Sequence, residues 1–155
     1  MNKKATVFIL DDDDINLMLL EEALQDDYLV ITEKQKLPAL MKIKSYNPDI
    51  ILLDVMMPEI SGYEFYKILK GDMATASTPV IFLSALDDPN SKAYGLGLGA
   101  ADYVTKPFNI NEIKIRIDNH LKVRVREAEL LKKINNVHKD YLHNQEKLKS
   151  VMDEY

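Results

Sequence analysis

Residues 47–65, NPDIILLDVMMPEISGYEF, constrain the fold of this chain more than any other stretch. They contain a short apolar run, residues 50–53, with the length and branching of a strand buried on both faces. Asp54 stands where that strand must end, and Ser61 can cap a helix that begins after the following bend. An acid between a buried strand and a helix lies at the carboxyl edge of an open sheet, where such folds bind ligands. Asp54 is therefore the candidate reacting group.

The same alternation of apolar strand and amphipathic helix occurs along the rest of the chain. The predicted strands are residues 6–10, 28–32, 50–53, 79–83 and 102–105. The predicted helices are residues 15–24, 37–46, 63–69, 88–98 and a last helix from about 109 to the end. Five strand–helix pairs predict an α/β fold, in which helices and right-handed crossovers cover both faces of a parallel sheet.

Local signals refine these elements. The second strand is flanked by charge, which favours an edge position, and Pro38 is tolerated in the first turn of its helix. Asp13 is expected to cap the first helix and not to bind metal. Gly95 and Gly97 stand inside the fourth helix, where each costs about 1 kcal/mol relative to alanine, so that helix is expected to be loose.

Composition limits the class of protein. Hydrophobic residues make up 46% and charged residues 29% of the 155 residues, as in soluble globular chains. No apolar run approaches the roughly 20 residues that cross a bilayer, and residues 1–4 show no cleavage-site pattern, so a cytoplasmic protein without membrane contact is expected. The absence of cysteine excludes disulfides, thiol catalysis and cysteine-ligated zinc. Residues 122–155 carry net charge +2 and residues 1–121 net charge −7, which argues against a nucleic-acid surface on the globular part.

Polar side chains follow four of the predicted strands. Because the carboxyl ends of parallel strands meet at one edge, Asp11, Asp12, Asp54, Ser84 and Lys106 are expected to converge. Several carboxylates so close together repel one another strongly unless a hard divalent cation lies among them, and Mg²⁺ prefers such oxygen ligands. The lysine and the serine hydroxyl are the groups that a phosphoryl group on the central aspartate needs for charge neutralisation and hydrogen bonding.

Four motifs carry a resemblance to a known family. They are FILDDDD at 8–14, DIILLDVMMPEISGYEF at 49–65, PVIFLSA at 79–85 and GAADYVTKPF at 99–108. In this order and at these separations, residues 5–121 resemble the receiver domain of two-component response regulators. The resemblance implies a flavodoxin-like doubly wound sheet with strand order 2-1-3-4-5.

The resemblance also implies the roles of the site residues. Asp54 is expected to accept a phosphoryl group from the phosphohistidine of a sensor histidine kinase or a phosphotransfer protein. The implied Mg²⁺ ligands are Asp11, Asp12, Asp54 and the backbone carbonyl of Met56. The protein is then a phosphoacceptor that hydrolyses its own modification slowly, not an enzyme in the usual sense.

Three further residues complete the implied switch. Ser84 and Lys106 contact the phosphoryl group, Tyr103 turns inward on activation, and the peptide bond between Lys106 and Pro107 is cis. Asp14 departs from the family pattern, since a proline or another short residue is common there, but it removes no ligand.

Two other functions remain open from the residues alone. A phosphohydrolase of the haloacid-dehalogenase kind would use Asp11 as its nucleophile, although its DxDx[T/V] motif is matched only partly and no large cap domain is present. An unphosphorylated scaffold that dimerises through its tail is the third possibility. The glycines at 95, 97 and 99 precede a strand instead of following one, which excludes a dinucleotide site.

Residues 122–155 form a segment of different character from the predicted receiver domain, residues 1–121. Alternating steps of four and three give a seam of Val123, Glu127, Leu130, Ile134, Val137, Tyr141, Asn144, Leu148, Val151 and Tyr155. Eight of these ten are apolar, which predicts a helix that pairs with a second copy as a parallel coiled-coil homodimer. The alternatives are a monomeric helix that covers a neighbouring domain and a linker to an output domain beyond Tyr155.

Overall fold

The computed structural model describes residues 3–155. The prediction that residues 1–4 carry no signal for cleavage therefore falls partly outside the described residues. By its internal contacts the chain divides into two units, and the boundary in the sequence lies between His120 and Leu121. The strands are β1 (Thr6–Leu10), β2 (Leu29–Glu33), β3 (Ile50–Asp54), β4 (Val80–Ser84) and β5 (Asp102–Thr105). The helices are α1 (Asp14–Leu24), α2 (Lys36–Tyr46), α3 (Gly62–Lys70), α4 (Pro89–Gly97) and α5 (Ile110–Asp153).

The five strands form one parallel sheet in the predicted order, β2-β1-β3-β4-β5. Every residue of β1, β3 and β4 is buried, whereas the charge-flanked β2 is a partly exposed edge strand, as its sequence predicted. In the register of the sheet, Asp54 pairs with Leu83 and Ser84 pairs with Thr105. The ends of β3, β4 and β5 therefore lie together at one edge.

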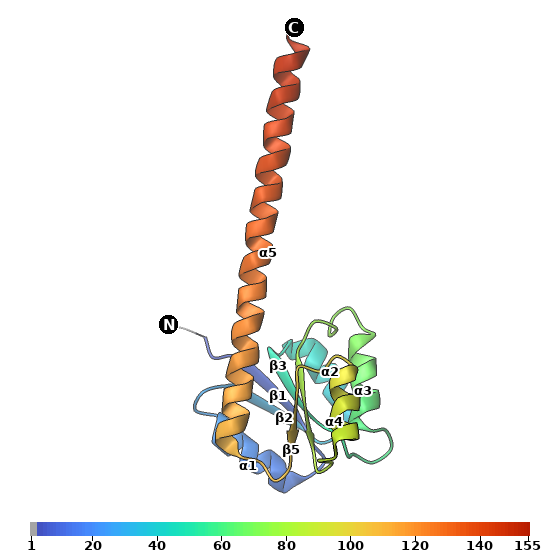
Figure 1. Cartoon of the computed structure of the whole chain (residues 1–155). Coiled ribbons are helices and arrows are strands. Elements are labelled where there is room, and N and C mark those ends of the chain that lie inside the picture. The colour runs from blue at the N-terminus through green and yellow to red at the C-terminus, as the bar shows by residue number, and fades with distance from the viewer. Residues whose placement is uncertain (1–2) are drawn as a thin grey trace. The chain divides into compact units, whose positions relative to one another are not determined.

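Helices cover both faces of the sheet in the first unit. Figure 1 shows α1 and the first turns of α5 on one face, and α2, α3 and α4 on the other. The largest fully buried side chains are Phe8, Phe65 and Phe82, and α5 contributes the buried Ile113 and Ile117. Each such side chain stabilises the fold by roughly 1.5–3 kcal/mol relative to an exposed position.

Side-chain caps start four of the helices, and in α5 the cap is Asn109, which accepts the backbone N–H of Glu112 at 3.1 Å. Asp13 accepts the backbone N–H of Ile15 at 2.9 Å, which confirms its predicted role as the cap of α1. The predicted cap Ser61 accepts the backbone N–H of Glu64 at 3.3 Å at the start of α3. Asp88 caps α4 in the same way. Asp13 therefore satisfies a helix end, and this leaves the neighbouring acids for another role.

The two glycines of α4 differ in their surroundings. A Cβ atom on Gly95 would lie 3.0 Å from the ring of Tyr103, 3.1 Å from that of Phe82 and 3.2 Å from that of Tyr63. Gly97 is the last residue of α4 and has no neighbour within 4 Å of the corresponding position. Gly95 is thus explained by the close approach of α4 to aromatic rings, a reason that the sequence did not reveal. The predicted looseness of α4 stays a prediction.

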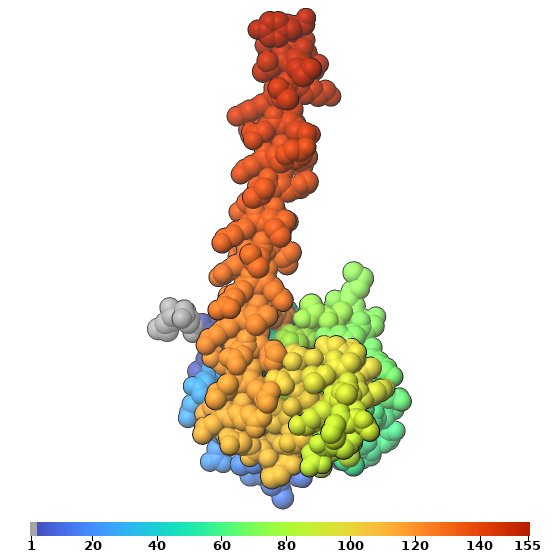
Figure 2. Space-filling model, viewed as in Figure 1, coloured from blue at the N-terminus to red at the C-terminus, as the bar shows by residue number. Residues whose placement is uncertain are grey.

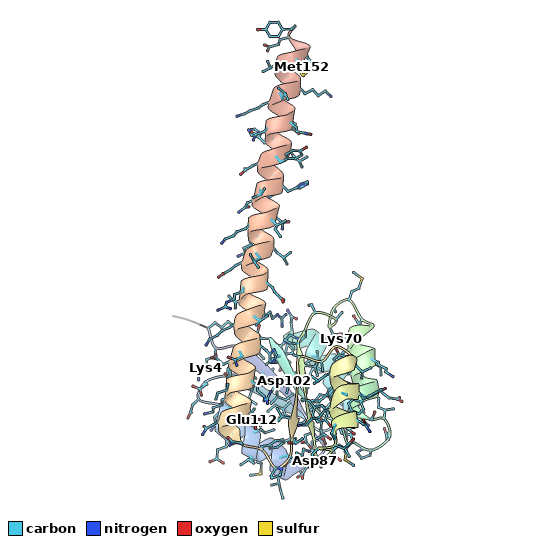
Figure 3. The ribbon with its side chains drawn as sticks, in the orientation of Figure 1. Lys4, Lys70, Asp87, Asp102, Glu112 and Met152 are labelled. Carbon is cyan, nitrogen blue, oxygen red and sulfur yellow. The ribbon has the colours of Figure 1, made fainter. Side chains whose placement is uncertain are left out.

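The first turns of α5 are tied to β5 by charge. Arg116 contacts Asp102 at 2.7 Å and Glu112 at 2.9 Å, and the two acids are labelled in Figure 3. His120 Nε2 lies 3.1 Å from Asp102 Oδ2. Although burial opposes ionisation of Asp102, its hydrogen bonds to Arg116 and its neighbours hold its pKa below the usual value. Asp102 therefore stays ionised and fixes the start of α5.

The second unit, Leu121–Tyr155, is the remainder of α5 and its last residues. The helix is continuous to Asp153, close to the predicted extent. From Val125 onward every residue is exposed, and Figure 2 shows their side chains projecting along the helix. Within residues 3–155, no helix has the length and apolar character needed to cross a membrane.

Candidate functional site

The polar residues predicted to converge do lie at one edge of the sheet. Asp54 and Ser84 end β3 and β4, while Asp11 and Lys106 directly follow β1 and β5. Lys106 Nζ lies 3.1 Å from Asp54 Oδ1 and 3.3 Å from Asp11 Oδ2. The parallel arrangement of the strands thus joins residues that are 95 positions apart in the sequence.

Three carboxylates form the acidic part of the site. Asp11, Asp12 and Asp54 each present an oxygen, and these oxygens lie within 4.8 Å of one another. Asp11 and Asp54 are buried, whereas Asp12 is exposed, so the cluster is open to solvent on one side. Carboxylate oxygens with room for water ligands suit Mg²⁺, and these three residues would hold it.

The backbone and one amide position these acids. Asp11 accepts the backbone N–H of Asp13 at 2.9 Å and the Nδ2 group of Asn16 at 3.2 Å. The backbone N–H of Met56 donates to Asp54 Oδ1 at 3.3 Å, which puts this peptide beside the acids. The role of the Met56 carbonyl as a ligand stays a prediction. The sequence did not single out Asn16, and only its place in the first turn of α1, next to the acidic run, could have suggested it.

The site holds Asp54 in an unusual protonation equilibrium. Burial, and then repulsion by Asp11, raise its pKa from 3.8 to about 7, although Lys106 and the Met56 N–H act in the opposite direction. Burial disfavours the charge of Lys106, but Asp54 and Asp11 outweigh it and raise the lysine pKa. A single lysine therefore does not fully offset the two buried acids. A divalent cation among them would favour the ionised, nucleophilic form of Asp54.

Gly62 allows the start of α3 to approach this edge. Its backbone N–H donates to the carbonyl of Val55 at 2.8 Å. A Cβ atom at Gly62 would lie 2.2 Å from the carbonyl oxygen of Asp54, closer than any side chain tolerates. The sequence indicated only a bend here. The structure shows that glycine is required because two backbone segments meet directly behind Asp54.

Ser84 and Tyr103 are connected through the peptide groups of Leu86. The backbone N–H of Leu86 donates to Ser84 Oγ at 3.0 Å, and the Tyr103 hydroxyl donates to the Leu86 carbonyl at 2.9 Å. Ser84 is buried and Tyr103 is only 4% exposed. The Tyr103 ring therefore lies inward in this structure. Its movement on modification, and that of Ser84, stay predictions.

The loop after β5 completes the edge. The peptide bond between Lys106 and Pro107 is cis, as predicted. The backbone N–H of Lys106 donates to the carbonyl of Ser84 at 2.7 Å, which aligns the ends of β4 and β5. Lys106 is thereby anchored by its backbone while its ammonium group reaches across to the acids.

A parallel five-stranded sheet with an acidic cluster and one lysine at its carboxyl edge defines a class of signalling domains. The family model of the response regulator receiver domain matches residues 7–118. The chain belongs to this family. The matched fold and site do not support the haloacid-dehalogenase alternative, in which Asp11 is the nucleophile.

Individual relatives agree with the family. The alkaline phosphatase synthesis transcriptional regulatory protein PhoP of Bacillus subtilis is 39% identical over 118 residues, which are 76% of this chain and 48% of the relative. The protein PilG of Pseudomonas aeruginosa is 41% identical over 92 residues, which are 59% of this chain and 68% of PilG. Other curated relatives are much longer than this chain, which spans 27% of one and 9% of another.

A solved structure shows the same fold. The receiver domain of the Francisella response regulator 1452 is 34% identical to this chain, with a TM-score of 0.73. The match covers 78% of this chain and 99% of that domain. The remainder of this chain has no counterpart in that domain.

Proposed function

We propose that this receiver accepts a phosphoryl group on Asp54 from the phosphohistidine of a sensor histidine kinase or a phosphotransfer protein. The observation that carries the proposal is the buried carboxylate of Asp54, which lies between two further acids and a lysine at an edge open to solvent. An oxygen of Asp54 attacks phosphorus, the phosphorus–nitrogen bond breaks, and its electron pair returns to the imidazole. Slow attack of water on the acyl phosphate restores the carboxylate.

The surrounding residues have separate roles in this transfer. Lys106 neutralises the charge that develops on the equatorial oxygens, and Ser84 donates its hydroxyl proton to one of them. Asp11 and Asp12, with Asp54 and the Met56 carbonyl, would hold Mg²⁺, which supplies positive charge at the phosphoryl oxygens. As Ser84 moves toward the phosphoryl group, Tyr103 and α4 respond. Hydrogen exchange across residues 84–104 should change on modification with beryllofluoride, and unchanged exchange would contradict the switch.

Mass spectrometry after treatment with acetyl phosphate and Mg²⁺ tests the acceptor. The wild-type chain should gain one phosphoryl group, and Asp54→Asn should gain none. Asp14→Asn is the matched control, because Asp14 pairs with Lys34 outside the cluster and should leave modification intact. Phosphate retained by Asp54→Asn would refute the assignment, and phosphate on Asp11 would revive the hydrolase alternative. A chain that takes up no phosphate would support the scaffold alternative.

Removal of the metal tests the acidic cluster separately. Chelation with EDTA should abolish modification, and added Mg²⁺ should restore it. Asp12→Asn should raise the Mg²⁺ concentration required by about tenfold or more, the effect of losing about 1.4 kcal/mol of ligand interaction. Modification that proceeds equally well in EDTA would contradict the metal site.

The domain division and the partners belong to the same proposal. Residues 1–121 act as the receiver, and residues 122–155 are an extension through which two copies pair as a parallel coiled coil. The proposal includes a cytoplasmic location and assigns no role to membrane or nucleic acid in the residues given. Light scattering at tens of micromolar should give a dimer for the full chain and a monomer for Ile134→Asp. Monomers in both cases would refute the pairing.

A further inference from the structure

Residues 131–155 carry a second apolar stripe beside the predicted seam. The first seam is the one described from the sequence, Val123 to Tyr155 in steps of four and three. The second seam consists of Leu131, Ile134, His138, Tyr141, Gln145, Leu148, Met152 and Tyr155. Leu131 and Met152 belong to this second seam alone, and they are 60% and 68% exposed, as open as the first-seam residues Leu130 and Val137 at 57% and 68%. The first seam by itself leaves Leu131 and Met152 unexplained.

Three residues of the second seam and one beside it have the spacing that receives a partner side chain in a coiled coil. They are Gln145, Leu148, Lys149 and Met152, and Met152 is labelled in Figure 3. These four residues are spaced i, i+3, i+4 and i+7, which is the four-residue hole that accepts one side chain of a facing helix in a coiled coil. In a parallel pair of identical helices, Leu148 of the second copy lies opposite this hole.

The two seams are related by a rotation of the helix. Both seams contain Ile134, Tyr141, Leu148 and Tyr155. Each of the other four residues of the second seam comes one position after a residue of the first seam in the sequence. Since successive residues are about 100° apart on a helix, the mid-lines of the seams are about 50° apart. We infer that residues 130–155 pair with a second copy of this chain in either of two registers, related by this rotation of each helix about its own axis. The inference rests on the coiled-coil pairing proposed above.

The apolar pattern and the exposed area favour a second copy of this chain as the occupant. A parallel pair brings each seam residue against its own counterpart, so that leucine meets leucine and tyrosine meets tyrosine along the whole length. A standard interface buries about 800 Å² per partner, so a stable pair needs exposed apolar surface along much of the helix. Leu, Ile, Val and Tyr side chains that are half or more exposed can provide this area.

The balance between the registers follows from their polar residues. Between residues 130 and 155 the first seam contains one polar residue, Asn144, and the second contains two, His138 and Gln145. The first register is therefore the more populated one. In that register Arg126 and Lys147 face Leu131 and Met152, and their aliphatic stems cover part of this apolar surface. The second register buries it, which gives the extension two pairing states between which a signal arriving along α5 can choose.

Single cysteines test the two registers, because the chain has none of its own. Leu130→Cys lies in the first seam alone, Leu131→Cys in the second alone, Ile134→Cys in both, and Lys132→Cys in neither. Under mild oxidation of the full chain, a disulfide requires Cα atoms within about 7 Å of each other. We expect Ile134→Cys and Leu130→Cys to link most, Leu131→Cys to link clearly, and Lys132→Cys to stay at background.

Two matched substitutions shift the balance. Asn144→Leu strengthens only the first seam and His138→Leu only the second, and both positions are exposed in the single chain. The ratio of linking at 131 to linking at 130 should fall in the first case and rise in the second, by about tenfold if one buried polar residue costs about 1.4 kcal/mol. Leu131→Cys at the background level, or a ratio that neither substitution changes, would overturn the second register. Background linking at Leu130→Cys and Ile134→Cys would instead refute the dimer itself.

Discussion

The two units of this chain use apolar residues in opposite ways. In the first unit they are buried within the chain, as Phe8, Phe82 and Ile117 are. In the extension, Leu130 and Ile134 are just as apolar, yet 57% and 61% exposed. Most of the stability of a helix comes from packing of its apolar face and not from its intrinsic propensity. The first unit therefore carries its own stability, whereas the exposed apolar residues of the extension add none through burial within the chain.

Charged residues show the reverse contrast. From Val125 onward they are exposed to solvent, and such charges contribute little to stability. In the first unit Asp11 and Asp54 are buried and share Lys106, although burial of a charge is costly. The receiver thus gives up stability at the edge where its chemistry occurs.

The largest expected effect comes from the core. Phe82→Ala removes a fully buried ring from β4 and should lower the free energy of unfolding by about 3–5 kcal/mol in urea. Ile134→Ala removes an exposed side chain of the extension and should change the unfolding of the first unit by less than about 0.5 kcal/mol. Equal losses from the two substitutions would break the contrast between the units.

An intermediate effect is expected from pH. Because the folded-state pKa of Asp54 is about 7 and its ordinary value is 3.8, the folded state binds more protons in between, and stability falls as pH rises through this range. Without divalent cations, the free energy of unfolding of Asp54→Asn relative to that of wild type should therefore increase by on the order of a few kcal/mol from pH 4 to pH 8. Urea titrations at each pH measure this difference. Asp153→Asn, which removes an exposed acid from the extension, is the control. A constant difference between Asp54→Asn and wild type would mean that Asp54 is not desolvated.

The smallest effect separates the glycines of α4. Gly97→Ala has open space and should stabilise the fold by up to about 0.5–1 kcal/mol through helix propensity. Gly95→Ala forces a methyl group against the Tyr103 ring and should destabilise the fold by about 1–3 kcal/mol, with a shift of the Tyr103 resonances in NMR spectra. Equal stabilisation by both substitutions would show that α4 does not pack tightly on the rings.

The sequence predicted what depends on strand ends and local caps. The convergence of Asp11, Asp54 and Lys106 follows from parallel strands alone, and the caps Asp13 and Ser61 act on neighbouring residues. Close approaches of one element to the backbone or rings of another were not predictable. Gly62 behind Asp54 and Gly95 against Tyr103 depend on distances between backbones that no local pattern encodes. The inward position of Tyr103 is likewise a property of packing.

The Leu86 peptide has a thermodynamic consequence. It links Ser84 to Tyr103, and the Tyr63 hydroxyl, 3.4 Å from that of Tyr103, donates to the carbonyl of Ser91 in α4 at 3.2 Å. If this series of hydrogen bonds couples the Asp54 site to α4, a ligand at either place changes the affinity of the other place by the same factor. A target protein that binds α4 more tightly after modification must therefore raise the affinity of Asp54 for beryllofluoride by the same factor. If the proposed phosphoryl transfer occurs, occupancy of the acceptor then depends on the abundance of such a target as well as on the donor.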